Sequence, residues 1–95
     1  MSLDVEWDPE KAAANESKHG VTFSEAATVL ADPLSITILD SDHSGAEERL
    51  LLLGQSRSGR LLLVSLTERA DAVRIISARP MTSRERRTYE NASRG

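Results

Sequence analysis

The sequence predicts an α+β domain in which helices pack against a small antiparallel sheet, with elements in the order β-α-α-β-β-β-β-α. The prediction depends first on two apolar stretches, Leu61 to Leu66 and Val73 to Ala78, in which Leu, Val and Ile dominate and no proline occurs. It depends second on two Thr-x-x-Glu motifs that are typical of helix starts, Thr22 to Glu25 and Thr82 to Glu85. Strands joined by short turns run antiparallel, so we expect a largely antiparallel sheet with helices on one face.

The N-terminal segment, residues 4–7, is predicted to be a short edge strand because apolar and acidic side chains alternate along it. A helix should follow, because Asp8 can cap it and Pro9 suits its first position. It should end at residues 18–20, where two cations precede a glycine.

A second helix should begin at residues 21–25. Thr22 and Glu25 have the spacing of a capping box, in which each side chain accepts a hydrogen bond from the other residue's backbone N–H. Pro33 ends this helix, because the residue before a proline avoids helical geometry. Residues 34–38 then alternate between apolar and polar, which predicts a half-buried strand.

The second half of the chain begins with a predicted strand at residues 49–55. Residues 56–59 turn the chain into the hairpin of residues 60–79, which we place at the centre of the sheet because both of its strands are so apolar. Pro80 then stops the sheet.

The last predicted element is a helix from Ser83 to about Asn91, opened by the second Thr-x-x-Glu motif. Charged residues dominate it, and Tyr89 and Ala92 are its apolar anchors. We therefore expect this helix to lie weakly on the sheet or to be held by a partner.

Composition indicates one small domain, residues 1–95, with an aliphatic core, since the chain has one Trp, one Tyr and one Phe. The absence of cysteine excludes disulfides and thiolate metal sites. The apolar runs are too short to cross a bilayer and the N-terminus is acidic rather than a basic signal region. We expect a cytoplasmic protein that does not bind membranes.

Charge is distributed unevenly along the chain. Residues 1–48 hold eleven acids and two lysines, whereas residues 49–95 hold ten arginines and four acids. An array of arginines on a rigid sheet suits a polyanion, because the planar guanidinium matches phosphate geometry. The same arginines can equally be solvated or paired with the acidic half of the chain.

An acidic loop at residues 40–48 contains His43. Its carboxylates and imidazole could bind a metal ion, but the spacing lacks the ligand pattern of a calcium loop and the paired histidines of a zinc site. We therefore expect a solvated connection and no metal.

Five different short motifs occur along the chain in a characteristic order. They are Trp7 to Lys11, Lys18 to Ala26 with Asn15 before it, Thr67 to Arg69, Arg74 to Arg79, and Glu85 to Glu90. Each is weak alone, but together they span the chain from Val5 to Glu90 and resemble the BrnT family of bacterial toxins.

The resemblance implies a compact fold similar to the RelE-type bacterial RNases and the activity of a ribonuclease toxin of a type II toxin–antitoxin pair. It also implies a BrnA-like antitoxin with a ribbon-helix-helix DNA-binding domain, so that DNA is contacted only through the antitoxin when the complex represses its operon. A homodimer or a hetero-tetramer with the antitoxin is expected, and no cofactor.

The chain shows no metal-binding cluster in its sequence, so RNA cleavage would use the substrate's own 2′-hydroxyl as nucleophile, with a proton acceptor, a proton donor and cations. His19 suits the general acid, because histidine titrates nearest neutrality and a helix C-terminus favours its charged form. Glu68 is the candidate base if Arg69 or Arg74 holds it. Arg79 is the candidate electrostatic stabiliser.

Other residues are candidates for contacts with RNA. Lys11, Asn15 and either Lys18 or His19 are spaced to lie along one face of the first predicted helix as a polar stripe. Arg69 and Arg74 are predicted to clamp phosphates. Tyr89 can stack on a base or donate a proton. Each has a simpler interpretation: the lysines can be solvated, and a lone apolar anchor such as Tyr89 is often core.

A second function remains open. A toxin-derived protein that has lost catalysis would serve as a binding module for its antitoxin in transcriptional repression. A third, a plain structural homodimer, would neither arrest growth nor bind RNA.

Overall fold

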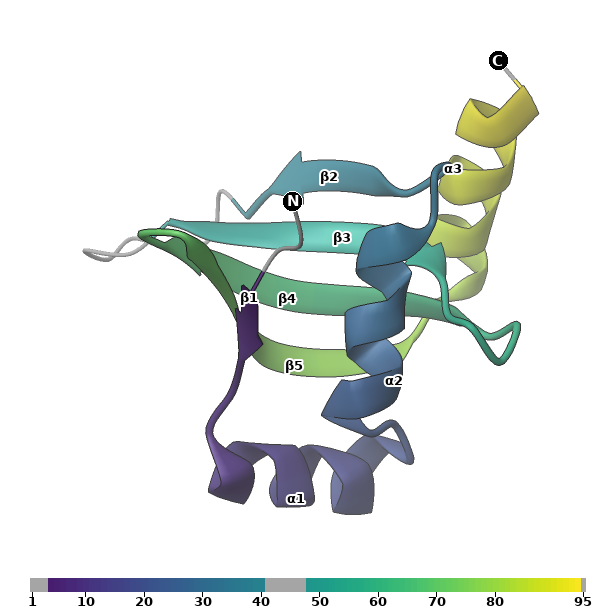
Figure 1. Cartoon of the computed structure of the whole chain (residues 1–95). Helices are drawn as coiled ribbons and strands as arrows, with labels where there is room; N and C mark the ends of the chain where they lie inside the picture. Colours follow the sequence, from purple (N-terminus) through teal and green to yellow (C-terminus); the bar gives the residue numbers. More distant parts are fainter. Residues whose placement is uncertain (1–3, 41–47, 95) are drawn as a thin grey trace.

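The computed structural model describes residues 4–40 and 48–94. Its elements follow the predicted order, with a short 3-10 helix added after the second helix (Figure 1). They are β1 (Asp4–Glu6), α1 (Pro9–His19), α2 (Phe23–Thr28), η1 (Val29–Ala31), β2 (Ile36–Leu39), β3 (Arg49–Gln55), β4 (Leu61–Arg69), β5 (Ala72–Pro80) and α3 (Ser83–Arg94). The predicted α+β class is confirmed. None of the described helices is long and apolar enough to span a bilayer.

The five strands form one sheet in the order β1-β5-β4-β3-β2. The pairs β2–β3, β3–β4 and β4–β5 are antiparallel, as the short turns predicted. β1 is parallel to the start of β5, with Asp4 to Glu6 in register with Ala72 to Arg74. The central hairpin is longer than predicted, because its ladder continues through polar residues as far as the pair Arg69–Ala72.

Buried apolar side chains form two clusters, one on each face of the sheet. The larger lies beneath α1 and α2 and includes Phe23 and Val64. The smaller joins α3 to the opposite face through Leu53, Leu63 and Tyr89. The expectation that all helices share one face is therefore wrong for α3. In Figure 1, α2 crosses in front of the strands and α1 lies beneath β5, while α3 stands at one end of the strands.

α3 is anchored more firmly than its sequence predicted. Tyr89 is 7% exposed, and its hydroxyl donates to Asp32 Oδ2 at 2.7 Å. Asp32 also accepts the backbone N–H groups of Gln55 and Leu34, at 2.8 and 2.9 Å. Burial acts to raise the pKa of Asp32, but these three hydrogen bonds outweigh it and leave the pKa lowered.

Gly54 in β3 allows η1 to approach the sheet closely. A Cβ atom at this position would lie 2.7 Å from Val29 Cγ1 and 3.1 Å from Asp32 Oδ2. Only glycine leaves that space open. The approach brings Asp32 over the end of β3, where it can reach Tyr89.

The first helix ends as its sequence predicted. Asp8 Oδ1 accepts the N–H of Glu10 at 2.9 Å, and Pro9 occupies the first turn. Gly20 adopts the left-handed conformation with φ of 69° and donates its N–H to the Glu16 carbonyl at 2.8 Å. His19 is therefore the last helical residue.

The two predicted capping boxes differ. Thr82 and Glu85 form the complete motif: the Glu85 N–H reaches Thr82 Oγ1 at 3.2 Å, and the Thr82 N–H reaches Glu85 Oε1 at 2.9 Å. Thr22 accepts the Glu25 N–H at 3.0 Å, but the Glu25 carboxylate turns to the β3–β4 connection instead. The box predicted at Thr22 and Glu25 is therefore only half formed.

Asn15 fixes α1 along the edge of β5 beyond the end of β1. Its amide donates to the Ala78 carbonyl at 2.8 Å and to the Val21 carbonyl at 2.9 Å, and its oxygen accepts the Ala78 N–H at 3.0 Å. The side chain thus replaces a neighbouring strand at Ala78. Asn15 is 6% exposed, so it does not belong to a solvated polar stripe.

Candidate nucleic-acid interface

Arg74 and Arg79 point to the same face of β5, the one turned away from α1 and α2. Their neighbours Val73 and Ala78 both belong to the larger core cluster, on the other face. Yet the two arginines are an odd number of positions apart, which in a regular strand puts two side chains on opposite faces. The strand must contain an extra residue between them.

A β-bulge supplies that residue. Ser65 of β4 pairs with Ser77 of β5, whereas the next residue, Leu66, pairs with Ile75, so the pairing skips Ile76. Residue alternation alone did not indicate this shift. The predicted platform of arginines depends on it.

We define the arginine face as the side of the sheet opposite α1 and α2 that carries four arginines: these are Arg49, Arg69, Arg74 and Arg79. Arg49 and Arg74 are both in register with Thr67, one on each side, so the three side chains form a row across β3, β4 and β5. Ser65 and Ser77 form the next row. Guanidinium groups bind phosphate oxygens in nucleic-acid complexes. Thr67 and Ser65 are only 1% and 7% exposed, and the Thr67 hydroxyl donates to the Glu48 carbonyl at 2.8 Å, so these two hydroxyls are closed to a ligand.

Arg74 is paired with Glu6, its register partner in β1. The distance from Arg74 Nη1 to Glu6 Oε2 is 3.0 Å, and the two side chains are 29% and 46% exposed. Exposed pairs of this kind contribute about 0.2–1 kcal/mol. A phosphate can therefore displace Glu6 at little cost.

Arg79 is held more tightly, by the carboxylate of Glu85 in α3. Nη1 donates to Oε1 at 2.9 Å and Nη2 donates to Oε2 at 2.8 Å, while Nη1 also donates to the Pro80 carbonyl at 3.1 Å. The hydrogen bonds to Arg79 lower the pKa of Glu85 against its partial burial, and the same bonds raise the pKa of Arg79. Both groups stay charged at neutral pH.

His19 lies near the end of β5 that carries Arg79. α1 is docked by Asn15 at Ala78, and His19 follows Asn15 by about one helical turn. The carbonyl of the next residue, Gly20, accepts a hydrogen bond from Arg60. Arg60 immediately precedes β4, whose start pairs with the end of β5. His19 is half-buried.

Arg69 and Arg74 are at the opposite end of the hairpin from His19. Five residues of strand between Arg74 and Arg79 correspond to roughly 15 Å. The predicted arginines thus share a face, and α1 ends near the Arg79 end of β5.

Glu68 lies on the other face of β4, toward α2 and η1. It lines a mainly apolar hollow of about 280 Å³, whose other walls are Leu30, Thr37, Leu50, Leu52, Leu66 and Val73. Of the two arginines that were candidates to hold Glu68, Arg74 is bonded to Glu6 on the opposite face instead. Val73, the register partner of Glu68, is roughly 20 Å along β5 from Arg79, so Glu68 and His19 do not reach one phosphate.

The remaining predicted residues have different environments. Lys11 and Lys18 are exposed on α1, seven positions apart and hence on similar sides of the helix. The ring of Tyr89 is packed in the smaller core cluster with its hydroxyl on Asp32, so it has no face open to a base. Tyr89 is therefore a core residue.

His43 and the other residues at 41–47 of the acidic loop lie outside the described residues. Within residues 4–40 and 48–94, no three His, Cys, Asp or Glu side chains are grouped as metal ligands.

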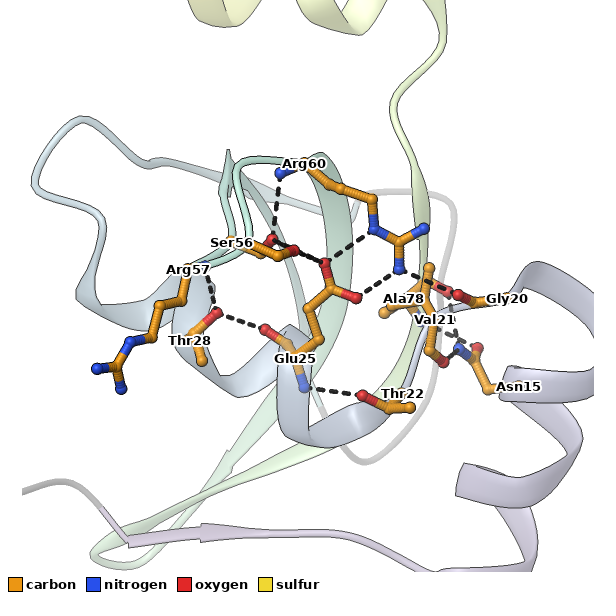
Figure 2. A network of polar contacts seen from close by, with 11 residues as sticks. Asn15, Gly20, Val21, Thr22, Glu25, Thr28, Ser56, Arg57, Arg60 and Ala78 are labelled. Atoms are coloured by element: carbon orange, nitrogen blue, oxygen red, sulfur yellow. Dashed lines mark hydrogen bonds and ion pairs between the residues drawn. The ribbon is translucent and has the colours of Figure 1, made fainter.

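Figure 2 shows a polar network that the sequence did not indicate, centred on Glu25. Glu25 Oε2 accepts the hydroxyls of Ser56 and Ser58 at 2.7 and 2.6 Å, and the Arg60 Nε–H at 2.9 Å. Oε1 accepts Arg60 Nη2, which also donates to the Gly20 carbonyl at 3.0 Å. The Arg60 hydrogen bond, followed by those of Ser58 and Ser56, outweighs burial and lowers the pKa of Glu25 to about 2.

Sequence reasoning missed one residue of the arginine face, Arg49, and the contact of Glu85 with another. Arg49 was read as the start of a strand, although its even spacing from Leu51 and Leu53 places it on the face opposite α1 and α2. Glu85 was read as a helix cap alone. Its carboxylate joins the cap to Arg79, which no local pattern indicates.

Comparisons with known proteins bear on the family and the fold. Residues 7–85 match the family described as the ribonuclease toxin, BrnT, of type II toxin–antitoxin systems. The fold is similar to the 1.1 Å crystal structure of the Brucella abortus ribonuclease toxin, BrnT, with a TM-score of 0.66 and 21% sequence identity over 86% of this chain and 100% of that one. A search of curated protein sequences found no match.

Proposed function

Because the chain belongs to the BrnT family of ribonuclease toxins of type II toxin–antitoxin systems, we propose that it cleaves RNA bound across the arginine face. The observation that supports this most directly is the common orientation of Arg74 and Arg79 produced by the β-bulge. Four guanidinium groups on one sheet face offer contacts to several phosphates of an RNA strand.

RNA binding in this proposal is mainly electrostatic. The arginine face belongs to the second half of the chain, which is rich in arginine, although the net charge of the whole chain is −3. The backbone phosphates would exchange with Glu6 at Arg74. Lys11 and Lys18 would extend the cationic surface from α1.

Cleavage is proposed at the end of β5, where Arg79 and His19 approach the same strand terminus. The RNA 2′-hydroxyl gives its proton to solvent water as its oxygen attacks the adjacent phosphorus. The bond to the 5′-oxygen breaks, and the products carry a 2′,3′-cyclic phosphate and a 5′-hydroxyl. Arg79 stabilises the charge that develops on the phosphorane, and His19 donates the proton to the leaving 5′-oxygen. No metal takes part, and Glu68 is too far along the hairpin to serve as the base.

The proposed partner is a BrnA-like antitoxin with a ribbon-helix-helix domain, which neutralises the toxin in the cytoplasm and carries the DNA contacts of the complex. A homodimer or a hetero-tetramer with the antitoxin is the proposed assembly. The family supports an antitoxin partner. The ribbon-helix-helix domain and the stoichiometry of the complex are further parts of the proposal.

Cleavage of a labelled single-stranded RNA by the purified protein tests the proposal. We expect cleavage that persists in EDTA, and a fall of about 100-fold or more in both His19→Ala and Arg79→Ala. Wild-type rates in both variants would refute the assigned roles. Inhibition by EDTA that added metal reverses would refute the metal-free step.

The alternative is a binding module without catalysis, and the pairing of Arg74 and Arg79 with carboxylates would favour it. Growth of a bacterial host that expresses the protein distinguishes this alternative from an active toxin. An active toxin arrests growth unless the antitoxin is co-expressed, and Arg79→Ala relieves the arrest. A binding module binds the antitoxin yet leaves both growth and RNA intact.

A further inference from the structure

The hydrogen bonds of Arg79 use one edge of its guanidinium and leave another edge open. Nη1 and Nη2 each donate one hydrogen to Glu85, and the second Nη1 hydrogen goes to the Pro80 carbonyl. Of the five N–H donors of arginine, those left are Nε–H and the second Nη2–H. Among the described residues, none accepts a hydrogen bond from either.

These two remaining donors lie side by side and parallel, which is the geometry that binds a carboxylate or a phosphate through two oxygens. The Arg79 side chain is 35% exposed. The structure therefore offers a free two-donor fork on the arginine face, at the end of β5 where His19 lies.

Arg60 provides a matched comparison at the same end of the hairpin. Its Nε and Nη2 both donate to Glu25, and Nη2 donates its second hydrogen to the Gly20 carbonyl. Only Nη1 hydrogens are left, so Arg60 has no complete fork for a phosphate. Arg60 and Arg79 each bind a glutamate through two nitrogens, but only Arg79 keeps two adjacent N–H donors for a further ligand.

We propose that Glu85 is a positioning residue that, with the Pro80 carbonyl, orients Arg79 so that its Nε–Nη2 edge binds one phosphate of the RNA. The inference rests on the proposed function and assigns Glu85 a part in it. Glu85 does not touch the substrate, and it acts by limiting the rotation of the Arg79 side chain.

The glutamate is itself fixed from two sides. Its Oε1 accepts the backbone N–H of Thr82 at 2.9 Å while also accepting Arg79 Nη1 at 2.9 Å. α3, which carries Glu85, is anchored on the sheet by Tyr89 and its bond to Asp32. The packing of α3 on the sheet therefore fixes the orientation of Arg79 through Glu85.

The test compares Glu85→Gln with Glu25→Gln in the full chain. Glutamine at position 85 can still accept the Thr82 N–H, but its NH2 group faces the Arg79 donors and the two-nitrogen bond is lost. Glu25→Gln makes the same change at the Arg60 pair. We would measure kcat and KM on a labelled single-stranded RNA, thermal unfolding, and the NMR signal of the Arg79 Nε–H with a 2′-deoxy analogue of the RNA as probe.

We expect kcat to fall by roughly 10- to 100-fold in Glu85→Gln, because a catalytic group displaced by about 1 Å costs up to about that factor. Glu25→Gln should keep the wild-type kcat. The analogue should shift the Arg79 Nε–H signal in the wild type, and this shift should be lost or strongly reduced in Glu85→Gln while the variant remains folded.

Arg79→Lys, which keeps the charge but has no fork, distinguishes the two levels of the proposal. Full activity in Arg79→Lys and Arg79→Ala would overturn the role of Arg79 in the proposed function itself. Loss of activity in those variants with a wild-type kcat in Glu85→Gln would overturn the positioning role alone. A higher kcat or tighter RNA binding in Glu85→Gln would also overturn it, because Glu85 would then compete with the phosphate.

Discussion

The N-termini of α2 and α3 share the Thr-x-x-Glu motif, but the glutamate of that motif makes different contacts in the two helices. Each has a threonine cap, a glutamate three residues later and an arginine from the same end of the β4–β5 hairpin. At α2 the glutamate leaves the cap and gathers donors from the β3–β4 connection. At α3 it stays in the cap and shares its oxygens with Arg79.

The difference shows how one local motif can serve stability or function. Glu25 uses both oxygens to close a turn and leaves Arg60 without a free fork. Glu85 satisfies its own helix and leaves Arg79 with one. A Thr-x-x-Glu motif in the sequence therefore predicts a helix start, but the arginine that meets it decides what else the glutamate does.

The comparison predicts its largest effect for Arg79→Lys against Arg60→Lys. Lysine supplies a charge but no planar fork, so RNA cleavage should fall by about 100-fold in Arg79→Lys. Arg60→Lys should cleave at the wild-type rate and lose stability instead. Single-turnover cleavage at a temperature where both variants are folded measures the contrast, and equal losses would remove the distinction between the two arginines.

Truncation of the two glutamates should order their structural roles. Glu25→Ala removes the acceptor of two serine hydroxyls and Arg60, and Ser56 is only 5% exposed, so we expect a loss of about 2–3 kcal/mol. Glu85→Ala removes a partly exposed pair and a cap, with an expected loss of about 1–2 kcal/mol. Urea unfolding of both variants tests the order, and the reverse order would contradict it.

The acid sensitivity of folding should depend more on Glu25. Its pKa in the folded protein is about 2, against 4.5 for the free group, so its stabilisation is complete above about pH 4.5 and is lost as the pH falls toward 2. Because Arg60 is 43% exposed, we discount the effect to about 1–2 kcal/mol.

Urea unfolding between pH 2 and 6 measures this dependence. Glu25→Gln should be less stable than the wild type at pH 6 and should show a flatter acid branch. Glu85→Gln should keep most of the slope, although the pKa of Glu85 is also lowered and its pair acts in the same direction. An unchanged slope in Glu25→Gln would contradict the assignment.

The smallest predicted effect is a loss of stability on removing a threonine cap, and it should be equal at the N-termini of α2 and α3. Thr22 and Thr82 each accept one backbone N–H from the residue three positions later, at 3.0 and 3.2 Å. Alanine at either position should cost about 1 kcal/mol of stability. Thermal unfolding that separates the two alanine variants by more than this cost would show that the caps differ as well as the glutamates.

Sequence patterns were sufficient for the order of the elements and for most helix starts, since caps, prolines and alternation act locally. The placement of α3 on the opposite face was not predictable, because it depends on a bond between Tyr89 and Asp32, residues distant in the sequence. The second strand also begins two residues later than predicted, because Asp32 accepts the N–H groups of Leu34 and Ser35 in a turn.

The candidate site was predictable in composition but not in arrangement. Arg74 and Arg79 could be named from the sequence, whereas their common face depends on the bulge at Ile76. Glu68 was named for its acidity, yet strand alternation turned it to the other face. Asn15 was read as part of a polar stripe, and its role at the β5 edge depends on a backbone that only the fold brings near.

The carboxylate of Asp32 joins two parts of the molecule that the sheet otherwise separates. Asp32 directly follows η1, and its Oδ2 accepts both the Gln55 N–H at the end of β3 and the hydroxyl of Tyr89 from α3. Opening of the C-terminal helix therefore removes one of the hydrogen bonds of a half-buried carboxylate on the other side of the sheet. The two layers should lose protection from hydrogen exchange together, in one cooperative unit, rather than as an independent tail and body.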